Sequence, residues 1–205
     1  MPSTTETRPA RCLGCGAGSR PHGAALVVHG DGTRERQVRG PPWATAVPEL
    51  GTVRVRRFEC QHCGACMIVV PRELLPRRLY TACAIGLALA VWALMGATEA
   101  EARARVSPFS IVGATAQTRW MTLRRWATDV GAGRLFGTSR APPAGFMRRQ
   151  HAERAAAALV ALAPPGLALD AAAFAGAARH SSVIPIIRSG ESRHPGSHGR
   201  NTASA

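Results

Sequence analysis

Two short cysteine motifs constrain this chain more than any other feature of its sequence. The first is Cys12-Leu-Gly-Cys15, the second is Cys60-Gln-His-Cys63, and a glycine follows each of them. Two residues between cysteines let both sulfurs of a tight turn face one ion, and four thiolates fill the tetrahedron of Zn²⁺. The glycines allow a positive φ without a penalty from Cβ. The sequence therefore predicts a zinc site with Cys12, Cys15, Cys60 and Cys63 as ligands.

The second motif continues to a third cysteine, Cys66, so three cysteines compete for two ligand places. Only Cys63 is followed by glycine, which favours Cys60 and Cys63 as ligands and makes Cys66 a buried thiol. Four thiolates already complete the coordination of zinc. We therefore expect the nearby histidines to be ordinary polar side chains rather than ligands: His22, His29 and His62.

The alternatives to a metal are disulfide bonds or a redox-active dithiol. The N-terminus, Met-Pro-Ser-Thr-Thr-Glu-Thr-Arg-Pro, has no apolar signal region. Without export the thiols stay reduced, and Cys-x-x-Cys spacing then indicates metal binding. We expect a cytoplasmic protein with Zn²⁺ as its cofactor.

The formal net charge of +14 indicates a polyanionic partner, because such self-repulsion does not help a small protein to fold. Nearly all of the excess is arginine, whose planar donor fork suits phosphates and base edges. Only 5% of the 205 residues are aromatic, while glycine and proline are plentiful. This composition favours several small modules over one large core, with nucleic acid as the first candidate partner.

The first module is predicted to be a small antiparallel zinc ribbon over residues 11–72, after a disordered N-terminus at 1–10. Strands are expected at 24–28 and 33–38, with Asp31-Gly32 as the hairpin turn between them. A loop at 40–48 leads to a strand at 52–58, where apolar and basic residues alternate. The core is thin, so bound metal would supply most of its folding free energy.

Residues 79–98 form a run of twenty residues without a charge, which is long enough for a membrane span. Alanine and glycine dilute the run, and Glu99 and Glu101 follow it at once. Basic residues lie on both sides, so the orientation of a span would be poorly specified. We therefore prefer the central helix of a helical bundle and keep a membrane-tethered protein as the alternative.

A bundle is predicted over residues 73–137. Thr98-Glu-Ala-Glu101 is a capping box that starts a short helix ending at Val106. A further helix should run from Thr115 to Val130 and end at Gly131. Its apolar residues recur with a period of 3.6 and predict a buried stripe: Trp120, Leu123, Trp126, Ala127 and Val130.

The opposite face of this third helix is polar and basic, as in a helix-turn-helix whose last helix enters the major groove. Arginine can bind guanine and glutamine can bind adenine, so Arg125 and Gln117 are the candidate base readers. Thr118 lies on the same face. Arg119 and Arg124 are candidate phosphate contacts. The predicted connector of about eight residues exceeds the usual three or four of this motif.

The rest of the chain divides into a linker with an alanine-rich extension at 138–180 and a disordered basic tail at 181–205. Helices are predicted at 146–163 and 167–180, separated by Pro164-Pro165-Gly166. Alanine buries little surface, so this extension either packs on the bundle or forms a contact in a homo-oligomer.

The order of these parts resembles bacterial transposase-associated proteins that carry a zinc ribbon followed by a helix-turn-helix. The likeness rests on the segment 56–64 around the second knuckle, on Leu74-Leu-Pro-Arg-Arg78 with Tyr80, and on Thr122-Leu-Arg-Arg-Trp126. It covers roughly residues 10–137. It implies zinc at the four cysteines, DNA binding through the third helix, and an origin in a mobile element.

Catalysis is not expected. The chain has twelve Asp and Glu residues, and the spaced trio Asp129, Glu153 and Asp170 lacks a strand to hold it at one pocket. No phosphate-binding glycine loop or nucleophile elbow occurs, so we expect no small-molecule substrate.

The sequence thus predicts an α+β protein, a small antiparallel zinc ribbon followed by an all-α helix-turn-helix bundle and a helical extension, that binds double-stranded DNA. A ribbon-type protein-interaction module remains a further alternative.

Overall fold

The chain folds as two compact units that share one long pair of strands. The computed structural model describes residues 4–110, 113, 119–137, 143, 145–183 and 187–189, with only the backbone of 182, 183 and 187–189. The first unit contains the described residues up to Arg34, with Val55–Val70 and 187–189; the second contains Glu35–Arg54 and the helices that follow Pro71. The predicted mixed α+β class is confirmed.

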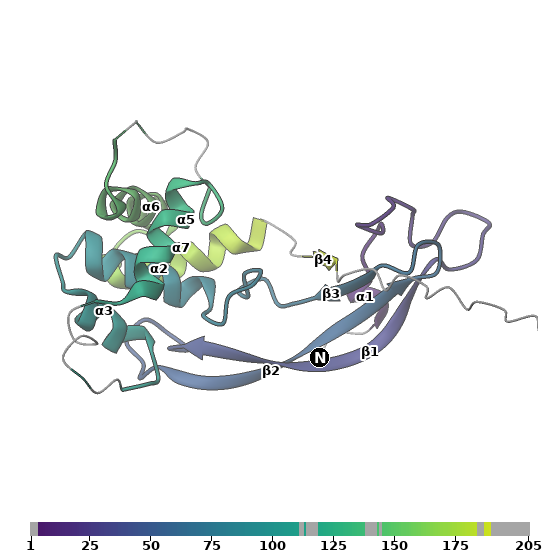
Figure 1. Cartoon of the computed structure of the whole chain (residues 1–205), viewed down its shortest axis with the longest axis horizontal. Coiled ribbons are helices and arrows are strands. Elements are labelled where there is room, and N and C mark those ends of the chain that lie inside the picture. The colour runs from purple at the N-terminus through teal and green to yellow at the C-terminus, as the bar shows by residue number, and fades with distance from the viewer. Residues whose placement is uncertain are drawn as a thin grey trace, which may run out of the picture. The chain divides into compact units, whose positions relative to one another are not determined.

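The first unit is built on a sheet with the strand order β1-β2-β3-β4, in which β1 and β2 lie side by side (Figure 1). β3 pairs antiparallel with β2, placing Glu59 opposite Cys66, and with β4 on its other side. Its apolar core is small, as predicted: Cys12, Val28, Phe58, Cys60, Ala65 and Met67. The strands are β1 (Val28–Gly40), β2 (Glu49–Cys60), β3 (Cys66–Val69) and β4 (Ile187–Ser189).

The predicted hairpin turn at Asp31-Gly32 is wrong, because β1 passes straight through both residues. Gly32 takes a φ of +80° inside the strand, so the glycine bends the strand without ending it. Asp31 forms an ion pair with Arg57 of β2 at 2.7 Å. The real turn is the loop between β1 and β2, which agrees with the loop predicted at 40–48.

Disorder was predicted for residues 1–10, but 4–10 have a defined structure. A short helix, α1, covers Thr4–Thr7, and Pro9 is buried. The hydroxyl of Ser19 donates a hydrogen bond to the carbonyl of Pro9. The segment is held by hydrogen bonds to the loop around the first cysteine pair, which its polar composition does not reveal.

The second unit is organised around α2 (Ala82–Ala93), from which nearly every side chain is buried. Thr81 caps its first turn, because the Thr81 Oγ1 accepts a hydrogen bond from the Ala84 N–H. Figure 1 shows α2 among the other helices of this unit. The predicted central helix is thereby confirmed.

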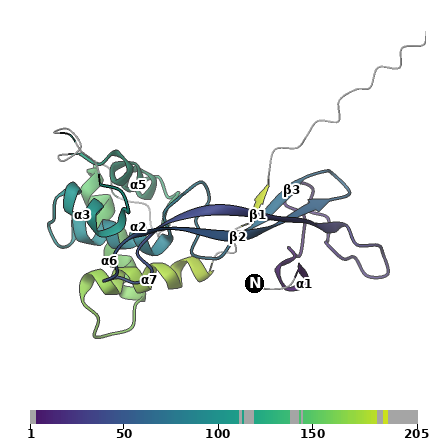
Figure 2. The ribbon, with the colours of Figure 1, turned by 90° about the horizontal axis from the view of Figure 1, so that it is seen from below.

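Among the described residues, four further helices pack against α2, and two of them come from the alanine-rich extension. Alanines of α6 and α7 belong to the same apolar core as α2, so the extension packs on the bundle. Figure 2 shows α6 and α7 next to each other. Small side chains bury little area each but let helices approach closely. The helices are α3 (Glu99–Val106), α5 (Met121–Gly131), α6 (Arg148–Leu162) and α7 (Leu169–Val183).

The third helix of the predicted motif, α5, begins at Met121 and not at Thr115. Trp120 is its N-cap residue with an extended backbone, and Arg119 precedes it. Much of the segment between α3 and α5, including the predicted start of the helix at Thr115, lies outside the described residues. The predicted buried stripe is confirmed at Trp120, Leu123, Trp126 and Ala127, while Val130 is half-buried. Trp120 and Trp126 pack edge-to-face at 5.1 Å. The glycine with positive φ after the helix is Gly133, not Gly131.

The hairpin tip at 35–54 belongs to the helical unit, whereas a boundary at 72/73 was predicted. The Arg39 N–H donates to the Leu79 carbonyl at 2.8 Å, and the Thr81 N–H donates to the Arg39 carbonyl at 3.1 Å. These bonds join the end of β1 to the segment that leads into α2. The hairpin tip therefore belongs with the helices although its sequence continues the strands of the first unit.

The membrane alternative placed a span at 79–98, but α2 has only twelve residues. A span needs about twenty apolar residues in one helix. Within the described residues, no helix has the length and apolar character to cross a bilayer.

Replacing Gly176 with alanine should destabilise the second unit. A Cβ at this position of α7 would overlap the backbone carbonyl of Leu159 in α6. In an open helix the same change would stabilise by about 1 kcal/mol, but overpacking here should cost about 1–3 kcal/mol. Urea unfolding followed by circular dichroism measures the difference. The matched control is Gly51→Ala, where the new Cβ meets open space and stability should change little; equal effects of the two changes would contradict the packing argument.

Candidate functional site

The four predicted cysteines come together in the first unit. Cys12 and Cys15 lie in the loop before β1, Cys60 ends β2, and Cys63 lies in the turn before β3. Their Sγ atoms all lie within 4.8 Å of one another. Cys12 Sγ is 3.6 Å from Cys63 Sγ, and Cys15 Sγ is 3.8 Å from Cys60 Sγ.

These separations fit a tetrahedral metal site. Four sulfurs at the usual zinc–sulfur bond length of about 2.3 Å would lie about 3.8 Å apart along each tetrahedron edge. A disulfide would require about 2.05 Å between sulfurs, and the four thiols are free. The cluster is therefore a candidate metal centre and not a disulfide framework.

The local backbone explains why each motif turns its sulfurs inward. The Gly16 N–H donates to the Cys12 carbonyl at 2.9 Å, and the Gly64 N–H donates to the Cys60 carbonyl at 2.8 Å. Gly16 and Gly64 have φ values of +74° and +69°, as the motifs predicted. Gly14 is also required, because a Cβ there would lie 2.9 Å from Ala65 Cβ.

The surroundings of Cys12 and Cys63 shift the pKa values of these two thiols in opposite directions. Burial raises the pKa of Cys12, but hydrogen bonds from the Cys15 and Gly14 N–H groups outweigh it and bring the pKa to about 7. The Ala65 N–H lowers the pKa of Cys63, but burial and the three neighbouring thiols outweigh it and raise this pKa to about 12. Four adjacent thiolates repel one another, so a bound cation is needed to ionise them together.

The other cysteines and histidines that the structure describes lie outside the cluster. Cys66 Sγ accepts a hydrogen bond from Arg57 at 3.7 Å, so the choice of Cys63 over Cys66 agrees with the structure. Cys66 is half-buried, and not fully buried as predicted.

Burial raises the pKa of Cys83 in α2 to about 12. The His29 ring contacts the Leu26 carbonyl at 2.6 Å.

The candidate DNA-binding residues fall into three groups. Gln117 and Thr118 lie outside the described residues. Arg119 and Arg125 are exposed, before and within α5. Arg124 is half-buried, and its Nε and Nη2 donate to Glu99 Oε1 at 2.8 and 2.7 Å. Arg124 thus has a structural partner that the helical pattern alone did not indicate.

Glu99 lies inside the predicted capping box of α3, but its side chain connects α3 to α5. Glu101 and Thr98 form the predicted capping box of α3. Glu99 is buried, and its second oxygen accepts the Trp120 N–H at 2.5 Å, where α5 has no side-chain cap of its own. Burial raises the pKa of Glu99, but Arg124 and the Trp120 N–H outweigh it and hold this pKa below its usual value.

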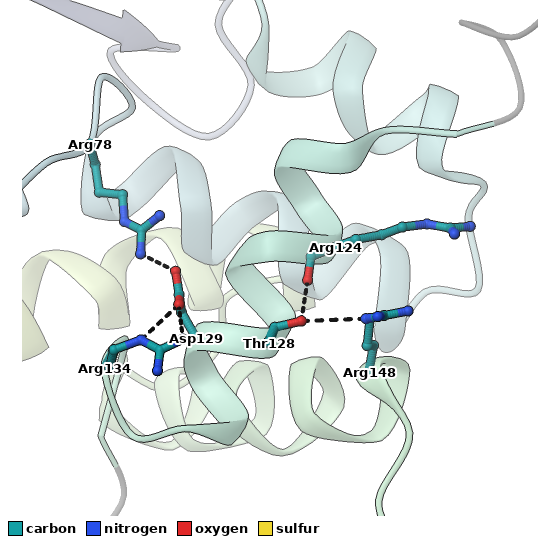
Figure 3. A network of polar contacts seen from close by, with 6 residues as sticks. All are labelled: Arg78, Arg124, Thr128, Asp129, Arg134 and Arg148. Carbon is teal, nitrogen blue, oxygen red and sulfur yellow. Dashed lines mark hydrogen bonds and ion pairs between the residues drawn. The ribbon is translucent and has the colours of Figure 1, made fainter.

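A pocket of about 340 Å³ opens beside α5, and arginines dominate its lining. Asp129 is its carboxylate. The Arg134 Nε and Nη2 donate to Asp129 Oδ1 at 2.9 and 2.6 Å, and Arg78 pairs with Oδ2 (Figure 3). Burial raises the pKa of Asp129, but the two arginines outweigh it and keep the pKa low. The arginines of the pocket are Arg78, Arg124, Arg125, Arg134 and Arg148.

Changing Glu99 to glutamine should remove part of the acid sensitivity of the helical unit. Because the folded-state pKa of Glu99 is lowered, its stabilisation is complete above the ordinary carboxyl pKa of about 4 and disappears as the pH falls through the folded value. The variant should lose about 1–2 kcal/mol at pH 7 and show a shallower decline below pH 5. Urea unfolding across this pH range measures both effects. Glu153→Gln on the exposed face of α6 is the control, and a matching response there would contradict the role of Glu99.

The chain was compared with protein-family models, with curated proteins and with solved structures, and nothing in these three sets matches it. Its function therefore has to be inferred from the cysteine cluster and from the arginines around α5.

Proposed function

We propose that this chain is a non-catalytic, zinc-dependent protein that binds duplex DNA and derives from, or acts with, a transposase. The observation that carries the proposal is the basic surface along α5, where arginines from several segments gather around one carboxylate. The cysteine cluster supports the zinc part, and the sequence resemblance supports the link to mobile elements.

Zinc suits the cluster because all four donors are thiolates, which soft or borderline ions such as Zn²⁺ prefer. When bound, the ion would join two turns 45–51 residues apart in sequence and neutralise thiolate charge. The small core of the first unit supports a structural role, since apolar burial alone stabilises so small a module weakly.

Duplex DNA suits α5 because the helix is about 16 Å long and the major groove admits one helix. Arg125 is exposed and, among the described residues, has no carboxylate partner. Arg119 stands at the start of the helix. Arg124 forms an ion pair with Glu99, so we assign to it the structural role of holding α5 in place. We assign base or phosphate contacts to Arg125 and Arg119.

Zinc analysis tests the metal assignment. Purified protein should carry one zinc per chain, and Cys15→Ser should lose it, because three thiolates bind less tightly than four. Elemental mass spectrometry gives the metal content, and circular dichroism before and after chelation reports the folding of the first unit. Cys66→Ser is the matched control and should keep its zinc; loss of zinc in this variant but not in Cys15→Ser would overturn the ligand set.

DNA binding tests the assignment of α5. Affinity for duplex should fall steeply with salt, as counterion release requires. Arg125→Ala should cost about 1–3 kcal/mol of binding free energy and relax base preference if the side chain reads a base. Fluorescence anisotropy on a random duplex pool and on selected sequences measures both.

The control for this test is Arg54→Ala, which removes the same charge from an exposed position on β2. Equal losses in the two variants would show that only total charge matters and would remove α5 from the binding surface. Equal loss on every sequence in Arg125→Ala alone would make this residue a phosphate contact.

A further inference from the structure

We propose that the arginine pocket beside α5 is a binding site for a single phosphate group, and that Asp129 occupies part of it as an internal counter-anion that weakens this binding. The inference deepens the proposed function, because the DNA backbone would be one source of the phosphate. Free phosphate is the other source, and the two are separated by experiment.

The pocket is assembled from segments that are distant in sequence. Arg78 precedes α2, Arg125 and Asp129 lie on α5, Arg134 follows α5, and Arg148 begins α6. Folding therefore brings these arginines together, in contrast to a run of basic residues along one exposed helix. The volume lies at the lower end of the range of small-ligand pockets.

The charges in the pocket are not balanced. Glu99 pairs with Arg124, which leaves four further arginines among the lining residues of the pocket and one carboxylate, Asp129. Asp129 is largely buried and already accepts from Arg78 and Arg134. Among the described residues, the polar contact of the Arg148 guanidinium is a long one, 3.4 Å from its Nε to the Thr128 hydroxyl. Among the described residues, neither Arg125 nor Arg148 has an acidic partner.

Asp129 shows what kind of ligand this arrangement accepts. Each of its two oxygens receives an arginine, and the donor fork of Arg134 closes on Oδ1 with both Nε and Nη2. The same fork binds phosphate oxygens. Arg134 is mostly exposed, with 63% of its side chain accessible, so it can turn from the carboxylate to an incoming anion. Figure 3 shows Arg78 and Arg134 on Asp129, with the Arg148 guanidinium beyond Thr128.

The negative charge of Asp129 must repel a second anion in so small a space. Where water screens them as in bulk, two unit charges about 4 Å apart interact by about 1 kcal/mol, which corresponds to about a fivefold change in affinity, within a range of about threefold to tenfold. Asp129→Asn keeps the size of the side chain and removes this repulsion. It should therefore strengthen phosphate binding by that factor.

Asp170→Asn is the matched control. Asp170 lies on α7 and pairs with Arg105 at 2.9 Å, and its exposure of 17% is close to the 14% of Asp129. Both variants raise the net charge equally and remove one carboxylate from an ion pair, but only Asp129 lines the pocket.

The experiment titrates the full-length, zinc-loaded protein with inorganic phosphate at constant ionic strength. NMR signals of backbone amides and arginine Nε–H groups report the site. We expect shifts at Arg125, Arg134 and Arg148, threefold to tenfold tighter binding in Asp129→Asn, no change in Asp170→Asn, and at least fivefold weaker binding in Arg148→Ala. Thermal unfolding checks that each variant is folded, and Arg148→Ala alone still decides the question if Asp129→Asn does not fold.

The proposal is overturned if phosphate shifts no pocket signals, if Arg148→Ala binds as the wild type does, or if Asp170→Asn gains as much affinity as Asp129→Asn. A second arm repeats the series with a short duplex. Tighter duplex binding in Asp129→Asn identifies backbone phosphate as a ligand of the pocket. Phosphate binding without duplex binding would refute the proposed function and keep the site, with free phosphate as its ligand. Duplex binding that is unchanged in both pocket variants would keep the function and exclude the DNA backbone as a ligand of the pocket, which leaves free phosphate if the first arm is positive.

Discussion

The convergence of four thiols on one point is the constraint on which the first unit depends. The sulfurs of residues 45–51 apart in sequence lie within 4.8 Å of one another, and little apolar surface surrounds them. Thiolates this close repel one another unless a cation lies among them. Because the two turns bring four thiols so close together, the thiols can ionise together only if a cation lies among them.

The helical unit faces the opposite problem, because arginines outnumber its carboxylates. Three of its acids form ion pairs with arginines. Glu99 pairs with Arg124, Asp170 pairs with Arg105, and Asp129 pairs with both Arg78 and Arg134. The first pair fixes the start of α5, since Glu99 also binds the Trp120 N–H. Charge compensation thereby determines which arginines support the fold and which remain available to a polyanion. Arg125 belongs to the second group.

Local signals in the sequence predicted local structure well. Spacing and composition within a few residues predicted three features: the turns at Gly16 and Gly64, the capping box at Thr98, and the central apolar helix. The Asp31-Gly32 turn failed because a glycine with positive φ fits a bent strand as well as a hairpin. The pairing of Glu99 with Arg124 and the arginine pocket could not be predicted, because both depend on side chains that only tertiary packing brings together. The cysteine cluster was predictable although its halves are distant in sequence, since each half carries the same motif.

Different interactions stabilise the two units, so the cysteine cluster and the arginine pocket can be considered separately. Buried aromatic and aliphatic side chains of α2, α5 and α6 form the core of the helical unit, and no cysteine of the cluster belongs to it. The first unit has only a few buried residues besides its cysteines. The strands β1 and β2 contribute residues to both units. The contacts that position α5, however, come from Glu99, Trp120 and Arg124, which all lie within the helical unit. If a metal occupies the cysteine cluster, its loss should therefore weaken the proposed DNA binding only by the share that the first unit contributes, while the arginine pocket keeps its geometry.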